Sequence, residues 1–152
     1  MPAALTIATV KRFHHSPATI RAIAAVKVAR AEAARITAHV ASYIEPAFLA
    51  LEPFYSDDGE VIKQSDDLFM VDGCEERIAA WYALCDQLHA ANGYKLEPGF
   101  CPALVAQNVA RKAEQAVLNL LGELVGCDGN DFNCTLEMRA KALELVLDPP
   151  TK

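Results

Sequence analysis

The longest patterned stretch of the chain covers residues 17–45, where small and apolar residues recur at alternating intervals of four and three. The positions that share this pattern are Ala22, Val26, Ala29, Ala33, Ile36, Val40, Tyr43 and Ala47. This heptad rhythm predicts one packed face of a long helix. Ser16 is a preferred N-cap and Pro17 suits the first helical position, so we expect the helix to begin there. Pro46 lacks a backbone donor and is expected to stop or kink it.

A second helix is predicted over residues 72–92. Asp72, followed by Glu75 three residues later, has the form of a capping box. Asn92-Gly93 is typical of a helix C-terminus. Trp81 is expected in the core because it shares one helical stripe with the apolar side chains of Ile78, Leu84, Cys85 and Leu88.

Two more helices are predicted, one from Pro102 to about Val125, where Gly126 ends it, and one over residues 135–147. The apolar face of the first is expected to hold Ala106, Val109, Ala113, Ala116, Val117, Leu120, Leu121 and Leu124. Its opposite face is expected to be solvated and holds Asn108, Arg111, Lys112, Gln115 and Asn119. The last helix is expected to turn inward Leu136, Ala140, Leu143 and Leu147.

Residues 53–72 break the helical pattern. Asp57-Asp58-Gly59 is a turn signal between two apolar pairs. This pattern is compatible with a small β-hairpin and equally with an irregular loop. With 152 residues, 53% of them hydrophobic, the chain can bury a core. We therefore expect an all-α, helical bundle-like single domain over residues 1–152. It would have about four main helices, the N-terminal one long.

Charge is divided unevenly along the chain. Residues 1–51 carry six Lys and Arg against two Glu, and residues 52–152 carry eight against eighteen acidic residues. Within residues 52–76 there are nine acidic residues and one Lys. Such asymmetry indicates either a partner-facing surface or two segments that pack on each other or on neighbouring copies. The candidate interaction residues are the basic Arg21, Lys27, Arg30 and Arg35 and the acidic Asp57, Asp58, Glu60, Asp66 and Asp67.

Catalytic and metal-binding signatures are missing from the sequence. None of the motifs GxGxxG, GxxxxGK[ST], HExxH and GxSxG occurs. The five cysteines are odd in number and no pair has CxxC spacing, which favours buried reduced thiols. We therefore expect no enzyme activity, no catalytic, cofactor-binding or metal-ligating residues, and no cofactor. No window is apolar enough to span a membrane, and the N-terminus lacks the order of a secretory signal.

One short segment resembles a known group of proteins. The residues Gly99-Phe100-Cys101-Pro102-Ala103-Leu104-Val105-Ala106, followed by an Ala/Glu/Leu helix, resemble a stretch in small uncharacterised helical proteins encoded by tailed bacteriophages. The resemblance covers about a fifth of the chain and brings no catalytic residues. It implies a viral protein, either a virion component or an accessory factor that binds a host protein.

These observations favour a non-enzymatic protein that acts through protein–protein interaction, in the host cytoplasm or in a virion. Its expected partner is a second copy, giving an oligomer, or a host or virion protein. A nucleic-acid-binding protein that uses the basic first helix is the alternative. Membrane association is not expected.

Overall fold

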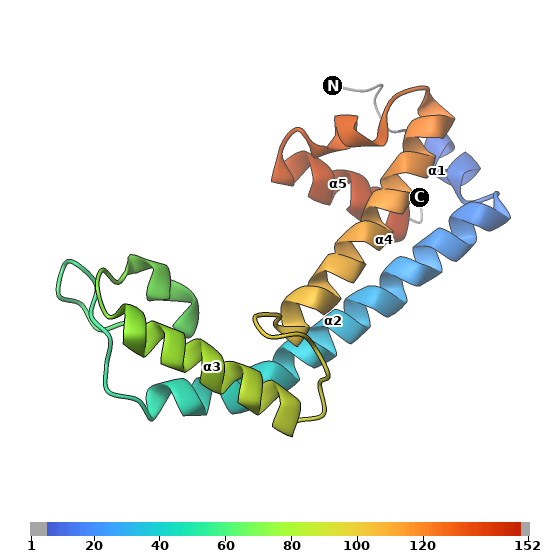
Figure 1. The fold of residues 1–152 in the computed structure, drawn as a ribbon. Helices are drawn as coiled ribbons and strands as arrows, with labels where there is room; N and C mark the ends of the chain where they lie inside the picture. Colours follow the sequence, from blue (N-terminus) through green and yellow to red (C-terminus); the bar gives the residue numbers. More distant parts are fainter. Residues whose placement is uncertain (1–5, 150–152) are drawn as a thin grey trace. The chain divides into compact units, whose positions relative to one another are not determined.

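Figure 1 shows the computed structural model, which describes residues 6–149. This part of the chain holds α-helices α1 (Ile7–Phe13), α2 (Pro17–Leu49), α3 (Glu75–Ala91), α4 (Pro102–Val125) and α5 (Leu136–Leu147). Two short 3-10 helices, η1 (Ser65–Met70) and η2 (Gly129–Asn133), lie between them. Within the described residues the only β-pairing is one isolated bridge. The all-α class and the four main helices are confirmed.

The chain forms two compact units. Unit 1 comprises Met1–Glu32 and Gln107–Lys152, and unit 2 comprises Ala33–Ala106. Helix α2 contributes its first half to unit 1 and its second half to unit 2. Each unit has a buried apolar cluster of its own, so each is described separately.

The face of α2 predicted from the heptad pattern is confirmed. Every predicted position is buried or half-buried, from Ala22 at one end to Ala47 at the other. A stop at Pro46 was one of the two predicted outcomes, and it is wrong. Helix α2 continues through Pro46 to Leu49. The last turn survives because Phe48 is buried in the core of unit 2, where its ring packs edge-on against Trp81 with centroids 5.2 Å apart. This packing offsets the missing backbone donor.

The core of unit 1 draws side chains from α1, α2, α4, η2 and α5. Its buried members are Phe13, Ile23, Val26, Val117, Leu118, Leu121, Phe132, Ala142, Leu143, Val146 and Leu147. The inward face predicted for α4 is partly wrong, because Val109 and Ala116 are exposed while Ala110 and Leu118 are buried. The inward face of α5 is also partly wrong, since Leu136 is 86% exposed.

Two glycines allow η2 to lie directly against α4. A Cβ added to Gly122 would stand 2.6 Å from the backbone oxygen of Cys127, and one added to Gly129 would stand 2.8 Å from Cα of Asn119. Both distances are shorter than real Cβ contacts. The backbone after α4 therefore folds back onto the helix only because these positions lack side chains.

The core of unit 2 is rich in aromatic side chains and includes residues of a very short hairpin. Tyr55 and Val61 form the single antiparallel bridge, and Ile62 N donates to Phe54 O at 2.8 Å. The predicted turn residues, Asp57, Asp58 and Gly59, lie between these pairs. The predicted hairpin is therefore present, but it has a single bridge and no strands. The side chains that fill the core are Phe48, Phe54, Ile62, Leu68 and Trp81. Trp81 is therefore a core residue, as predicted.

Both ends of α3 are set by left-handed backbone. The predicted capping box at Asp72 is wrong, because the N-cap is Cys74, with φ 60° and no side-chain capping bond. Gly73 also has positive φ, so the chain turns between Asp72 and the helix. The C-terminus is as predicted: Asn92 is the C-cap and Gly93 has φ 91°. Tyr94 N then donates to His89 O at 3.0 Å, completing a Schellman motif that fixes the position of Tyr94.

Candidate functional site

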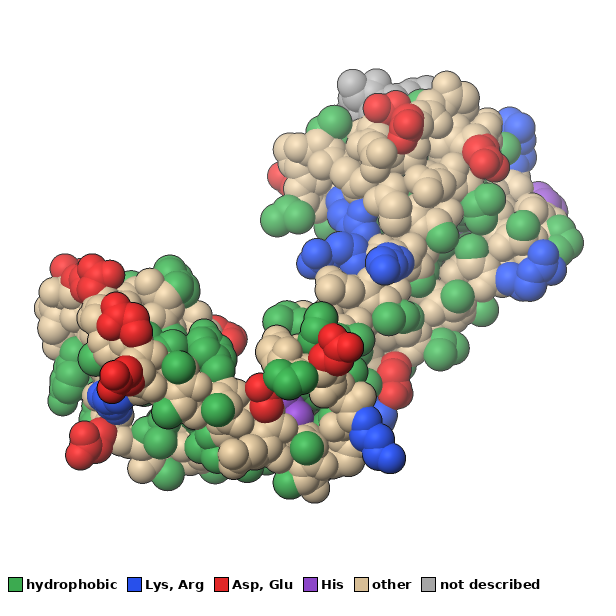
Figure 2. Space-filling model, viewed as in Figure 1, with side chains coloured by type: hydrophobic (Ala, Val, Ile, Leu, Met, Phe, Trp, Pro, Cys, Tyr) green, Lys and Arg blue, Asp and Glu red, His purple; other side chains and the backbone are tan. Residues whose placement is uncertain are grey.

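The most highly charged part of unit 2 is the stretch of residues 52–76, called here the acidic segment. All its carboxylate side chains are exposed except that of Asp67, which is half-buried. Asp57 and Asp58 lie in the hairpin turn with Glu60 directly after it, and Asp66 and Asp67 occupy the first turn of η1. Figure 2 shows red carboxylates gathered over this unit with green apolar side chains among them.

Large apolar side chains are exposed within the same segment. Alternation along the hairpin turns Phe54 and Ile62 into the core and leaves their neighbours Tyr55 and Val61 exposed. The same division occurs in η1, where Leu68 is buried and Phe69 is 83% exposed. Met70 is exposed as well. The carboxylates of this segment are evident in the sequence, whereas the exposure of these apolar side chains is not.

Arg77 secures the acidic segment to α3. Its guanidinium carbon lies 4.1 Å from the centroid of the Phe54 ring, and its Nη2 donates to Glu52 O at 2.7 Å. This cation therefore stabilises the base of the segment through cation–π and hydrogen-bond contacts. The exposed side chains of this segment are therefore neighbours in sequence of core residues: Tyr55 follows Phe54, Val61 precedes Ile62 and Phe69 follows Leu68.

The four basic candidates on α2 have different surroundings. Arg21 and Lys27 are exposed in unit 1, and Arg35 is exposed in unit 2. Arg30 instead forms an ion pair with Glu114 of α4, with Nη2 and Oε2 2.7 Å apart. The structure therefore does not present the four as one equivalent basic surface.

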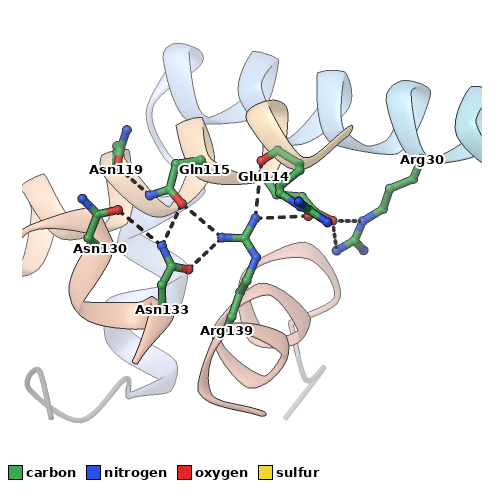
Figure 3. A network of polar contacts seen from close by, with 8 residues as sticks. Arg30, Glu114, Gln115, Asn119, Asn130, Asn133 and Arg139 are labelled. Atoms are coloured by element: carbon green, nitrogen blue, oxygen red, sulfur yellow. Dashed lines mark hydrogen bonds and ion pairs between the residues drawn. The ribbon is translucent and has the colours of Figure 1, made fainter. Parts of the chain in front are cut away.

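Arg30 belongs to a polar network in unit 1, shown in Figure 3. Glu114 accepts from Arg30 through Oε2 and from Arg139 of α5 through Oε1, at 2.7 and 3.2 Å. Arg139 Nη1 also donates to Gln115 Oε1 and Asn133 Oδ1, at 3.0 and 2.7 Å. Gln115 is therefore half-buried rather than solvated as predicted. The network connects α2, α4, η2 and α5 and is structural in character.

A second polar cluster joins α2 to α3 and the following loop in unit 2. Tyr43 Oη and His89 Nδ1 are 2.6 Å apart, as are His39 Nδ1 and Tyr94 Oη. The rings of His39 and Tyr43 meet edge-on with centroids 5.4 Å apart. Burial raises the pKa of Tyr43 to about 12, with Tyr94 adding to the effect, and burial lowers the pKa of His89 against the influence of Asp86. Both groups are therefore neutral near pH 7.

The expectation of buried thiols is wrong for Cys74 and Cys134, which are exposed, whereas Cys85, Cys101 and Cys127 are half-buried. Burial, together with the charge of Asp86, raises the pKa of Cys85 to about 11, and burial also raises the pKa of Cys127. A thiol with a raised pKa is a poor nucleophile at neutral pH.

Across residues 6–149, no group of three or more His, Cys, Asp or Glu side chains could hold a metal ion. No described helix combines the length and the apolar character that crossing a membrane requires.

Comparison with known proteins adds no relative: no family model, curated protein or solved structure matches this chain.

Proposed function

We propose that the chain is a non-enzymatic binding protein whose acidic segment docks onto a protein surface that carries both basic and apolar side chains. The observation that carries the proposal is Phe69, a large aromatic side chain 83% exposed on a segment with nine carboxylates. Exposed apolar side chains that lie together mark interaction sites more often than they mark accidents of the surface.

The arrangement has the composition of a docking surface. Tyr55, Val61, Phe69 and Met70 supply apolar contact area, and aromatic residues and Met are enriched in interface cores. The exposed carboxylates of the same segment would steer an oppositely charged partner to it and disfavour acidic ones. A partner with Lys or Arg around an apolar centre would satisfy both parts.

We propose that the partner is a virion or host protein, which is what the resemblance of residues 99–106 to tailed-phage proteins would imply. Both sub-cases place the same demand on the acidic segment, since either partner must present positive charge to it. Detection of the chain in purified particles would favour the virion role, and its absence from particles would favour a host-directed role.

A pair of fluorescent helical peptides tests the proposal. One peptide has a leucine stripe flanked by Lys and Arg, and its twin has Glu at every basic position. Fluorescence anisotropy at low ionic strength should show binding of the basic peptide alone, weakening as salt is added. Phe69→Ser should reduce the affinity roughly tenfold or more, as expected for an interface anchor. The pair Asp57→Asn and Asp58→Asn should chiefly slow association.

Matched controls lie on α5 in unit 1. Leu136→Ser removes an equally exposed large side chain, and Glu137→Gln with Glu144→Gln removes two exposed carboxylates. Both controls should leave the affinity unchanged. Equal binding of the acidic twin, or full binding by Phe69→Ser, would reject the proposal. A DNA duplex that binds more tightly than the basic peptide would favour the nucleic-acid role for Arg21 and Lys27 instead.

A further inference from the structure

We infer that a second copy of this chain is a partner of the acidic segment, which docks onto the outer face of α2 in unit 1 of that copy. The outer face of α2 is defined here by Ile20, Arg21, Ala24, Lys27 and Val28. The inference rests on the proposed function of the acidic segment and names the surface that it binds.

In the part of the chain that the structure describes, the outer face of α2 is a solvent-exposed helix face that carries apolar side chains and positive charge. Ile20 and Val28 lie eight residues apart and are 54% and 71% exposed. Ala24 lies midway between them on the same face, and Arg21 and Lys27 flank it, all exposed. Burial of Ala22, Val26 and Ala29 on the opposite side of the helix fixes this orientation.

Charge complementarity selects this face for the acidic segment. Residues 17–31 of α2 contain no Asp or Glu, whereas residues 52–76 contain nine. The whole units differ in the same sense. Unit 1 carries ten Lys and Arg against eight acidic residues, a net of +2, and unit 2 carries four against twelve, a net of −8. A basic face on one copy and an acidic segment on another therefore attract each other.

The apolar parts also match. The outer face of α2 offers Ile20 and Val28 beside the small Ala24, which leaves room for a bulky side chain to reach the helix surface. The acidic segment offers Phe69 and Tyr55 as projecting aromatic side chains. Contact between them would bury apolar area on both sides while each positive charge meets a carboxylate, as in interfaces with an apolar core and a polar rim. The contact joins two different surfaces, so it yields a reciprocal dimer, a ring or an open chain of copies.

Sedimentation velocity of the full chain across a concentration series tests the inference. At low ionic strength the mass should exceed the 16.5 kDa of one chain, and it should fall to that value at high salt. Phe69→Ser and Val28→Ser should each weaken association roughly tenfold. Leu136→Ser on α5 is the matched apolar control and should associate as the unaltered chain does.

A charge exchange identifies the two surfaces directly. Arg21→Glu with Lys27→Glu, and separately Asp57→Lys with Asp58→Lys, should each reduce association. In a mixture of the two variants both contacts between unlike chains have opposite charges, because the reversed face meets the reversed segment and the unaltered face meets the unaltered segment. Association should therefore return in the mixture. Lys112→Glu with Lys141→Glu, at exposed positions outside both surfaces, changes the net charge by the same amount as the α2 variant and should leave association unchanged. Circular dichroism of each variant confirms that it is folded.

The outcomes separate this inference from the proposed function. A chain that is monomeric at every concentration but still binds the basic peptide overturns the second copy as partner and leaves the proposed function standing. An oligomer unaffected by the α2 and acidic-segment variants also overturns it. A monomer that fails to bind the basic peptide rejects both.

Discussion

The two units use their polar side chains in opposite ways. In unit 1 the Glu114 carboxylate is held between two guanidiniums, those of Arg30 and Arg139, and the Gln115 and Asn133 amides complete the network. The side chains of Arg139 and Glu114 are only 16% and 17% exposed. Here the ion pairs of Glu114 on α4 with Arg30 on α2 and Arg139 on α5 connect three helices.

In unit 2 Tyr43 and the buried His89 are neutral near pH 7, and most charges lie outside. The interior contacts are the Tyr43–His89 and His39–Tyr94 hydrogen bonds. The carboxylates of the acidic segment are almost all exposed. The comparison teaches that the little-exposed charges of unit 1, those of Arg139 and Glu114, serve the fold, whereas nearly all carboxylates of the acidic segment in unit 2 face the solvent.

Breaking the network of unit 1 should have the largest effect on stability. Arg139→Met leaves the Glu114, Gln115 and Asn133 side chains without their shared donor, and we expect a loss of about 3 kcal/mol in the free energy of unfolding. Urea unfolding followed by circular dichroism measures it. Lys141→Met, two residues away and exposed, should change stability little. Equal effects of the two substitutions would show that the network contributes nothing specific.

The corresponding change in unit 2 should cost less, because it removes one neutral hydrogen bond. Tyr43→Phe leaves the buried His89 ring without its hydroxyl partner, and we expect a loss of about 1.5 kcal/mol. Tyr82→Phe, at an exposed position of α3, is the control and should have no effect. Urea unfolding with Trp81 fluorescence reports on this unit directly. A Tyr43→Phe variant as stable as the unaltered chain would contradict the role given to this contact.

A stabilising change is expected at the start of α3. Cys74 holds a left-handed conformation that costs a non-glycine residue free energy, so Cys74→Gly should raise stability by up to about 1 kcal/mol. Cys74→Ala keeps the strain and should not. Thermal unfolding of both variants and of the unaltered chain measures the difference. A lower melting temperature for Cys74→Gly than for the unaltered chain would show that the Cys74 side chain stabilises the fold by more than its left-handed conformation costs.

The smallest effect concerns a single imidazole. Because the pKa of His89 is lowered in the folded state, the unfolded chain binds more protons as pH falls below about 6.5. Stability should therefore be full above that pH and decline as pH decreases toward the folded pKa of His89. His89→Gln should flatten this part of the pH profile, measured by urea unfolding. An unchanged profile in the variant would assign the acid sensitivity to other groups.

The sequence predicts the parts of the fold that depend on periodicity. The α2 face was found because apolar residues recur strictly at heptad spacing, and Trp81 was found because it shares a stripe with other apolar residues. In α4 the rule fails because Ala and Val occur on both sides of the helix, so Val109 could not be distinguished from Ala110. Of the two outcomes predicted for Pro46, the stop is wrong, because the packing of Phe48 that holds the last turn of α2 is a tertiary effect.

The candidate site was half visible in the sequence. A count of carboxylates finds the acidic segment, but it cannot tell that Leu68 turns inward and Phe69 outward. The network around Arg139 leaves no local signal, because Arg139 and Glu114 are 25 residues apart and Arg30 is farther still. Only the packing of the helices brings these side chains together.

The most direct test of the central claim is to map the binding of the basic helical peptide on the isotope-labelled chain by NMR. The account predicts that the amide signals of residues 54–70 shift on addition of the peptide, with those of Tyr55, Val61 and Phe69 among the most affected. It also predicts that the signals of α5 stay in place. Shifts confined to unit 1, or no shifts at all, would contradict the assignment of the acidic segment as a protein-binding surface.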